Sequence, residues 1–452
     1  MQHDVFLSEI MRGFSERGVA YQILRDYEGL PDSFSNDVDI YVSQAGYFSA
    51  ISVINDVCSR NRLRVLRRRE RYGYTGILVD VAAPNGGFLT LDVNTRIHWK
   101  GFDAIDHDVM SGAVQEFRGM RVSPLGVEAA IVVLKELLMS KKVKSRNNAK
   151  ERMRHCVVND RELFIGSLAR ILGQREAEHL ADMVIKREWD VIESNAENYR
   201  RLVIRNSLST KPIQSVWGAA VWLYKAVQDK WFANHGCVVA IVGPDGAGKT
   251  TLMNGLDGAF NDAGLFAGVD RYEANVGVLP RLSALLGRGG RAKQQEQFSA
   301  DNYQGQHSGM KQPPNSLSRS IVYLMWYSVD YALGYFLFQR KRAQGRLIIF
   351  ARYYYDYYFQ RANSNLPGWL IRMAEWVVPA PDLVFYVERD AEDIYRLKPE
   401  LELAEIYRQQ KIICQLAASR RNFVSIAGDD GVGQSLDLMV RNIKKCMSRH
   451  VS

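Results

Sequence analysis

The sequence contains little that would indicate a disulfide framework or a zinc site. Its five cysteines are scattered through 452 residues, and no two of them form a CxxC pair. Closely spaced cysteines are the usual sign of both kinds of structure, so we expect free thiols and a reducing, cytoplasmic compartment. The N-terminus carries charges throughout and lacks the apolar core of a secretory signal, which favours the same compartment.

The sequence also lacks a long apolar run without charge. Its most apolar window, residues 321–338, contains Asp330 and many aromatic residues, so it predicts a buried helix of a globular domain. The net charge of +9 is a moderate excess that suits anionic ligands. The basic run at residues 59–71 has no interleaved aromatics, so we interpret it as a solvated helix surface and expect no nucleic-acid partner. Peripheral membrane contact and homo-oligomer formation both stay open.

A shift in hydrophobic patterning divides the chain into three parts. Residues 1–125 show short apolar runs separated by polar turns, with helix-like stretches between them, which is typical of an α+β domain. Residues 126–234 follow a helical periodicity and predict a helical extension and connector. In residues 235–452, β-branched strands alternate with helices, which predicts a three-layer α/β/α domain with a parallel sheet. The length of the chain agrees with two domains.

The strongest motif is GPDGAGKT at residues 243–250, between a strand-like run, VVAIV, and a helix-like stretch. It satisfies GxxxxGK[ST] in the required strand–turn–helix context. Gly246 and Gly248 let backbone N–H groups converge on phosphate oxygens. Lys249 can reach the β- and γ-phosphates, and Thr250 can bind Mg²⁺ through its hydroxyl. ATP and Mg²⁺ are therefore the expected cofactors.

The fingerprint GPDGAGKTT resembles that of the thymidylate-kinase-like branch of P-loop kinases. Residues 237–452 carry further features in that family's order: an apolar helix with Asp330, a strand ending in a motif like Asp-Arg-Tyr, and a segment at 379–402 that leads, in the family, into a basic lid. The resemblance implies that Asp245 faces the acceptor and that Arg352 grips its anionic group. It implies that the nucleotide is bound by Gly243, Gly246, Ala247, Gly248, Lys249, Thr250, Thr251 and Arg389. It makes Arg389, Arg396 and Lys398 lid candidates that neutralise charge on the transferred phosphoryl group.

One position departs from the family's pattern. LIIFARYYYD, residues 347–356, aligns with the family's strand, but Ala351 stands where Asp-Arg-Tyr has its carboxylate. A methyl group can neither orient Mg²⁺ nor accept a proton. Three explanations stay open: a substitution introduced to trap a substrate complex, natural loss of catalysis, or transfer of the role to Asp356 or Asp330. Because the surrounding residues still fit a kinase, we favour an introduced substitution as the hypothesis.

The N-terminal part carries a second group of candidate residues. Asp37-Val-Asp39 begins an apolar strand, and alternate residues of a strand share a face, so the two carboxylates point the same way. With Asp92 on another strand, they resemble the acidic trio of the nucleotidyltransferase fold, which implies that Asp37, Asp39 and Asp92 hold Mg²⁺. Upstream the chain departs from that family, because Leu24-Arg25-Asp26 replaces its Gly-Gly or Gly-Ser turn.

The sequence therefore predicts a Mg²⁺-dependent kinase that moves the γ-phosphoryl group of ATP to an acceptor. We prefer a hydroxyl of a sugar or surface glycan, because bacterial two-part proteins of this kind resemble enzymes that act on sugars. The alternatives are a nucleoside monophosphate kinase, a nucleotidyltransferase with an ATP-sensing P-loop half, and a nucleotide-gated regulatory or defence protein. The predicted catalytic residues are Lys249, Asp245, Ala351, Arg352, Arg396 and Lys398.

Overall fold

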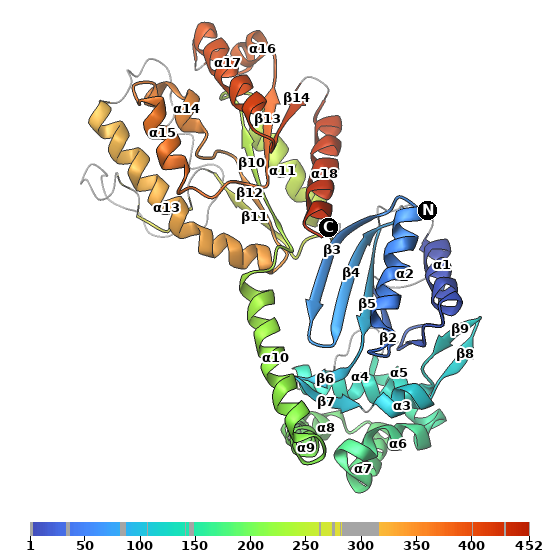
Figure 1. Ribbon diagram of the computed structural model, residues 1–452. Coiled ribbons are helices and arrows are strands. Elements are labelled where there is room, and N and C mark those ends of the chain that lie inside the picture. The colour runs from blue at the N-terminus through green and yellow to red at the C-terminus, as the bar shows by residue number, and fades with distance from the viewer. Residues whose placement is uncertain are drawn as a thin grey trace. The chain divides into compact units, whose positions relative to one another are not determined.

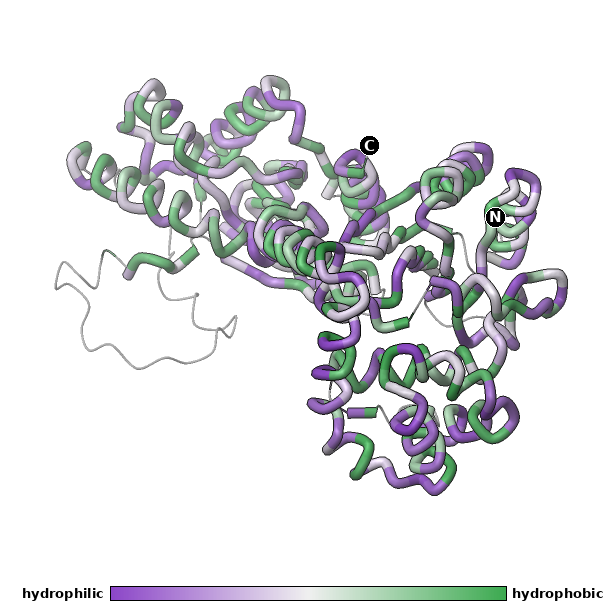
Figure 2. Tube along the Cα trace, turned by 60° about the horizontal axis from the view of Figure 1, so that its bottom comes forward, coloured by the Kyte–Doolittle hydropathy of each residue, from purple (hydrophilic) through white to green (hydrophobic). Residues whose placement is uncertain are grey.

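The protein consists of two compact units, Met1–Asp229 and Lys230–His450, and each is described by itself. The computed structural model describes residues 3–32, 37–81, 87–105, 107–140, 142–143, 149–261, 264–273, 276–280, 282, 316–399, 401–428 and 431–451. Figure 2 shows hydrophobic and hydrophilic residues alternating along many of the helices, as expected for helices that bury one side.

The first unit is built on a seven-stranded mixed sheet with the order β3-β4-β5-β2-β1-β9-β8 (Figure 1). Its strands are β1 (Tyr21–Ile23), β2 (Asp37–Val42), β3 (Arg64–Arg71), β4 (Tyr74–Asp80), β5 (Phe88–Asn94), β8 (Gln115–Phe117) and β9 (Met120–Val122). β2 runs parallel to β5 and antiparallel to β1, so β2 lies inside the sheet with a neighbour on each side. A separate ribbon pairs β6 (Ile97–Trp99) with β7 (Phe102–Ile105).

Two hydrophobic cores hold the first unit together. One lies between the sheet and α1 (His3–Glu16) and α2 (Tyr47–Arg60), where Phe6 and Ile54 are fully buried. The other is helical and includes Phe164 and Tyr199. The remaining helices are α3 (His107–Gly112), α4 (Leu125–Ser140), α5 (Ala149–Asn159), α6 (Arg161–Leu172), α7 (Gln174–Lys186), α8 (Trp189–Ser194), α9 (Ala196–Thr210) and α10 (Pro212–Trp231). Burying one such large side chain contributes about 1.5–3 kcal/mol. Residues 126–229 of the predicted helical extension belong to this unit.

Most of the basic run at residues 59–71 forms a strand, so its interpretation as a helix surface was wrong. β3 covers Arg64–Arg71 at one edge of the sheet. It pairs antiparallel with β4, a partner that a pattern of charges does not reveal. Arg69 and Arg71 each form an ion pair of 2.8 Å with Asp229. Charged side chains on an edge strand discourage pairing with another chain.

The second unit has a five-stranded sheet, all of it parallel, with the order β11-β12-β10-β13-β14. Its strands are β10 (Cys237–Val242), β11 (Val269–Tyr272), β12 (Leu347–Phe350), β13 (Leu383–Glu388) and β14 (Phe423–Ala427). Every residue of β10 is buried, as expected for the central strand of a sheet covered on both faces. The prediction of a mixed α/β chain with a parallel C-terminal sheet is confirmed.

Helices cover both faces of this parallel sheet (Figure 1). α11 (Lys249–Asn261) and α18 (Val432–Arg449) pack against each other on one face. The other face carries α13 (Leu317–Ala343), α14 (Asp356–Phe359), α15 (Gly368–Glu375) and α17 (Leu403–Ser419), and the shorter elements are the 3-10 helix η3 (Arg361–Asn363) and α16 (Ala391–Leu397). In such a sheet all strands end at the same edge, so the loops that follow them gather into one site.

α13 is the helix that contains the whole apolar window at residues 321–338. Among the described helices it alone is long and apolar enough to cross a membrane, by length and composition, and 33% of its most apolar stretch is buried. Leu324, Tyr331 and Phe338 pack into the core of the second unit, and Asp330 is fully buried beside them. One side of α13 is therefore a core face.

Candidate functional site

The phosphate loop of the second unit lies at the carboxyl end of its central strand. β10 ends at Val242 and α11 begins at Lys249, so residues 243–248 make the turn between them. Gly246 and Gly248 have φ angles of +94° and +98°, which L side chains rarely adopt. A glycine turn at a helix N-terminus lets successive N–H groups converge on phosphate oxygens.

Lys249 contacts the loop from within. Its Nζ donates hydrogen bonds to the carbonyl oxygens of Gly243 and Pro244, at 2.8 and 2.9 Å, and to a carboxylate oxygen of Asp245 at 3.2 Å. Burial lowers the pKa of Lys249, whereas the charge of Asp245 raises it. The ammonium is therefore partly desolvated and surrounded by acceptors, a setting in which a phosphate oxygen is a strong competing partner.

The loop residues fit ATP with Mg²⁺. Ala247 is buried, whereas the hydroxyl-bearing residues Thr250 and Thr251 are exposed on the first turn of α11. In the part of the chain that the structure describes, no group of three or more His, Cys, Asp or Glu side chains could hold a metal ion. Mg²⁺ in this loop would therefore depend on phosphate oxygens and the Thr250 hydroxyl. When bound, ATP supplies the transferable phosphoryl group and the metal supplies charge neutralisation.

Four charged side chains form a continuous chain beside the loop. Arg352 donates a hydrogen bond of 2.6 Å to Asp245, the carboxylate that Lys249 also contacts. A second guanidinium nitrogen of Arg352 lies 3.8 Å from Asp356. Although burial raises the pKa of Asp245, Lys249 and Arg352 outweigh burial and hold it well below its usual range. Burial dominates at Asp356 and raises its pKa to about 6, against the opposing charges of Arg352 and Lys249.

Ala351 lies at the edge of the sheet where the loops gather. It follows β12 and is 8% exposed, and its backbone N–H donates to the carbonyl oxygen of Tyr272 at 2.9 Å. Its side chain offers no acceptor, whereas the carboxylate of Asp356, five residues later, already belongs to the charge chain. Of the three explanations for Ala351, this geometry supports transfer of the role to Asp356. The introduced substitution stays a hypothesis.

Asp330 is fully buried and binds backbone instead of facing the phosphate loop. Its carboxylate accepts hydrogen bonds from the backbone N–H groups of Val276, Gly277 and Leu279 at 2.9, 3.1 and 2.7 Å. These residues belong to the segment that follows β11. A buried carboxylate with three such donors is well satisfied and fixes the segment, which argues against Asp330 as the replacement for the missing carboxylate.

Replacing Asp330 with Ala is expected to destabilise the second unit by about 3–5 kcal/mol, because three backbone N–H groups lose their acceptor. Thermal unfolding followed by calorimetry measures the change. Asp330→Asn keeps one carbonyl oxygen and is the matched control, with a smaller loss expected. A catalytic Asp330 would show the opposite pattern, with unchanged stability and abolished activity in the Asn variant.

The three lid candidates have different surroundings in the structure. Arg389 directly follows β13 at the edge of the sheet where the loops gather, and its carbonyl oxygen accepts from Gln410. Lys398, just after α16, lies against the phosphate loop, because a Cβ added at Gly246 would come within 3.1 Å of the Lys398 Cβ. Arg396 has a side chain 74% exposed and pairs with carboxylates of its own helix. The structure thus brings Lys398 to the loop, and the charge-neutralising roles of all three stay predictions.

Replacing Gly246 with Ala is expected to weaken ATP binding by about tenfold or more. An alanine at this position would have to keep the backbone φ of +94°, and its Cβ would meet Lys398. The left-handed backbone alone costs about 1–2 kcal/mol. Gly258→Ala, in the last turn of α11, is the matched control, since its Cβ would meet nothing within 4 Å. That control should bind ATP normally and gain stability. Titration calorimetry with ATP checks both, and equal affinities would contradict the expectation.

In the first unit the predicted acidic trio lies side by side. β2 and β5 are parallel neighbours, and their register places Asp39 opposite Asp92 and Asp37 opposite Thr90. Tyr74 of β4 donates a hydrogen bond of 2.7 Å to Asp92. Burial is the largest influence on Asp92 and raises its pKa to about 6, despite that hydrogen bond. The register therefore brings Asp39 and Asp92 next to each other, and the role of the trio stays a prediction.

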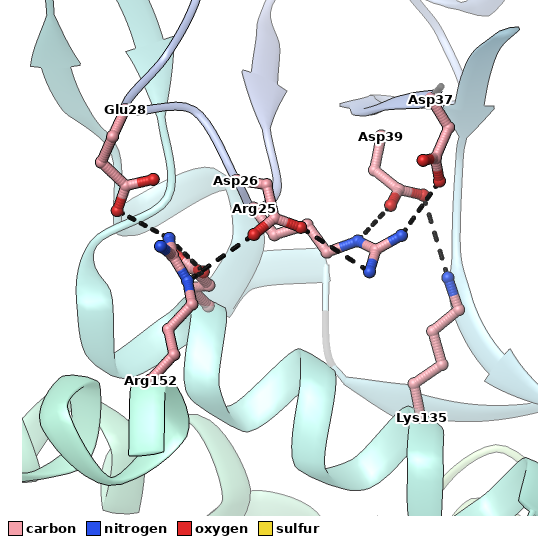
Figure 3. A network of polar contacts seen from close by, with 8 residues as sticks. Arg25, Asp26, Glu28, Asp37, Asp39, Lys135 and Arg152 are labelled. Atoms are coloured by element: carbon pink, nitrogen blue, oxygen red, sulfur yellow. Dashed lines mark hydrogen bonds and ion pairs between the residues drawn. The ribbon is translucent and has the colours of Figure 1, made fainter. Parts of the chain in front are cut away.

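Arg25 lies between the two carboxylates of β2, as Figure 3 shows. Its Nε donates to Asp39, and a second guanidinium nitrogen donates to Asp37 at 3.1 Å. Lys135 of α4 approaches the other carboxylate oxygen of Asp39, with Nζ 3.8 Å from Oδ1. These two cations supply the charge neutralisation that Mg²⁺ would provide. Metal binding by the trio stays a prediction, and the ion pairs of Arg25 with Asp37 and Asp39 oppose it.

Sequence reasoning missed Lys135 and Tyr74 as parts of this first-unit site. Lys135 comes from a helix of strongly apolar sequence, and Tyr74 from a strand whose neighbour cannot be read from local pattern. The signal for Arg25 was present, because Leu24-Arg25-Asp26 interrupts the expected glycine turn. The signal for Asp356 was its position only four residues after Arg352, with which it forms an ion pair of 3.8 Å.

Comparisons with known proteins give distant structural similarity. No family model and no curated protein matches the chain. A thymidylate kinase from Ehrlichia chaffeensis matches with 13% identity and a TM-score of 0.32, over 46% of this chain and 98% of its own. A thymidylate kinase from Candida albicans matches with 14% identity and a TM-score of 0.33, over 48% and 93%. The C-terminal half thus bears a distant structural resemblance to thymidylate kinase, and scores this low say nothing about its substrate.

Proposed function

We propose that the second unit transfers the γ-phosphoryl group of ATP, with Mg²⁺, to a hydroxyl of a sugar or surface glycan. The observation that carries the proposal is the charge chain Lys249–Asp245–Arg352–Asp356 at the edge of the parallel sheet, beside the phosphate loop. Phosphoryl transfer depends on positioning and electrostatics more than on covalent chemistry, and these four charged side chains supply both.

Each of the four charged residues has its own role in the proposed reaction. Lys249 and the loop amides hold the phosphates, and Arg352 fixes the two carboxylates on either side of it. Asp356, with a pKa near 6, is ionised at neutral pH and accepts the proton of the attacking hydroxyl. Asp245 has the lowest proton affinity of the group and stays ionised, so it orients Lys249 and Arg352.

A neutral acceptor is favoured over a nucleoside monophosphate by the state of Arg352. A monophosphate acceptor needs a cation to bind its phosphate, and Arg352 is the residue that the family resemblance assigns to this task. Here its guanidinium is already neutralised by Asp245 and Asp356. A hydroxyl acceptor without its own charge does not have to displace either carboxylate.

The test uses the full chain with γ-labelled ATP and Mg²⁺, supplied in parallel with neutral monosaccharides, extracted surface glycan and nucleoside monophosphates. Label on the sugar or glycan class is the expected result. Label on a nucleoside monophosphate would replace this acceptor with the thymidylate-type alternative. Tight ATP binding without transfer to any acceptor would overturn the kinase proposal in favour of a nucleotide-gated protein.

A further inference from the structure

The carboxylate site of the first unit is built around Arg25 (Figure 3). Arg25 follows β1, and β1 pairs antiparallel with β2, where Leu24 N–H donates to the carbonyl oxygen of Asp39 at 2.9 Å. The same strand pairing that places Asp37 and Asp39 therefore also delivers the guanidinium to them. Arg25 reaches the carboxylates as part of the sheet's architecture.

Arg25 also pairs with a second set of charged residues, through Asp26. Asp26 lies 3.8 Å from one of its nitrogens, and Asp26 in turn lies 3.7 Å from Arg152 of α5. Arg152 also pairs with Glu28 at 2.7 Å and with Glu128 at 2.8 Å. Alternating charges thus run from α5 to the strand carboxylates. A guanidinium with this many partners is costly to displace, so a divalent cation does not readily replace it.

One acceptor in the site has no hydrogen-bond donor in the described part of the chain. Asp39 is 4% exposed, and its Oδ1 is buried with no hydrogen-bond partner among the described residues, since Lys135 at 3.8 Å is beyond hydrogen-bond distance. Asp39 lines a cavity of about 370 Å³ together with Asp92. A buried carboxylate oxygen without a donor is unfavourable, and a ligand hydroxyl would satisfy it.

The charged side chains of the cavity wall do not favour an anionic ligand. The lysine and arginine side chains that line the cavity besides Arg25 are Arg71, Arg96 and Lys135. Arg71 and Arg96 pair with carboxylates, at 2.8 Å from Asp229 and 3.1 Å from Asp103, and Lys135 lies 3.8 Å from Asp39. A nucleoside triphosphate would bring several negative charges next to Asp39 and Asp92. Without a metal ion those charges would repel each other.

The other surfaces of the cavity suit a ring with apolar faces and polar edges. Tyr72 and Trp222 contribute aromatic side chains, and Ile131 and Met139 contribute aliphatic ones. Aromatic faces pack against C–H-rich surfaces while carboxylates accept hydroxyl protons, and a sugar ring presents both features. The volume lies within the range typical of small-molecule sites.

We propose that Arg25 takes the place of the divalent cation in this carboxylate site, so that the first unit binds a neutral carbohydrate without metal and does not bind a metal–nucleoside triphosphate. The site is separate from the phosphate loop, and carbohydrate binding here does not require the kinase activity proposed above. A failure of either proposal is therefore visible without the other.

The first experiment measures binding of Mn²⁺ alone to the full chain by proton relaxation, without nucleotide. The unchanged chain should show no Mn²⁺ binding up to about 1 mM, the weak end of the affinity range. Arg25→Ala should create a Mn²⁺ site, and Arg25→Ala with Asp39→Asn should lose it again. Mn²⁺ bound by the unchanged chain and lost in Asp39→Asn would overturn the replacement of metal by Arg25.

The second experiment measures binding of glucose, galactose, mannose, N-acetylglucosamine and a neutral oligosaccharide by saturation-transfer NMR, with EDTA present and ATP absent. At least one sugar should bind, and Asp39→Asn, which keeps the shape of the side chain, should weaken it by about tenfold or more. Asp56→Asn, at a surface pair with Arg17, is the matched control and should leave binding unchanged. Absence of binding by the whole panel, or equal binding by both variants, would overturn the carbohydrate assignment.

Discussion

Lys249→Ala is expected to lower the rate of γ-phosphoryl transfer by about 10²–10³-fold, the loss typical of removing one charge-stabilising donor from an active site. The side chain lies within the phosphate loop and contacts Gly243, Pro244 and Asp245. Its removal takes away the ammonium that we propose binds the phosphates and also one of the two cations that lower the pKa of Asp245. Single-turnover kinetics with γ-labelled ATP measures the change.

Lys411→Ala is the matched control for this variant, because Lys411 is exposed on α17 and its loss should leave the rate unchanged. Thermal unfolding of both variants separates a catalytic loss from a folding defect. The variant also distinguishes the proposed kinase from a nucleotidyltransferase whose P-loop half only senses ATP. In that alternative Lys249→Ala would merely modulate activity, whereas Asp37→Ala would abolish it.

The phosphate loop could be predicted from the sequence because its information is local. Residues 243–250 are contiguous, the preceding strand is a short β-branched run, and the glycines mark the positions that need positive φ. The parallel sheet followed from the alternation of strands and helices. Local patterns of this kind reflect backbone preference and burial, which can be recognised from residues that are close in the sequence.

The charge chain and the Arg25 site depend instead on contacts between distant segments. Arg352 meets Asp245 across 107 positions of sequence, and Lys135 approaches Asp39 from a helix nearly a hundred residues away. Asp330 illustrates the same limit, since its partners follow β11, about fifty residues earlier. A sequence shows that such residues are charged, but the pairing of strands decides which charges meet.

Arg25 also shows how a departure from a motif can carry structural information. The sequence indicated only that a glycine turn was missing. In the structure, Arg25 occupies the place of the missing glycine turn, and its side chain donates hydrogen bonds to both carboxylates of β2. The residue that departs from the motif is the one that pairs with Asp37 and Asp39, so the departure itself marked a structural feature of the site.

Asp356→Asn is expected to lower the rate of transfer by about 10²–10⁴-fold, the usual contribution of a general base. Its carboxylate must be ionised to accept the hydroxyl proton, and burial raises its pKa to about 6. The rate of the unchanged chain should therefore fall as pH drops below 6, where the carboxylate becomes protonated, and level off above pH 7. In Asp356→Asn this acidic limb should disappear. Asp393→Asn, on α16, is the control and should keep the limb.

Ala351→Asp decides between the two explanations of the missing carboxylate. If Asp356 carries the role, Ala351→Asp should change the rate of the unchanged chain by less than about tenfold and should partly rescue Asp356→Asn, because the new carboxylate would follow the same strand. If Ala351 is an introduced substitution, Ala351→Asp alone should raise turnover by orders of magnitude. The geometry predicts the first result, because Arg352 already fixes Asp356 beside the phosphate loop, and a second carboxylate there would compete for the same guanidinium.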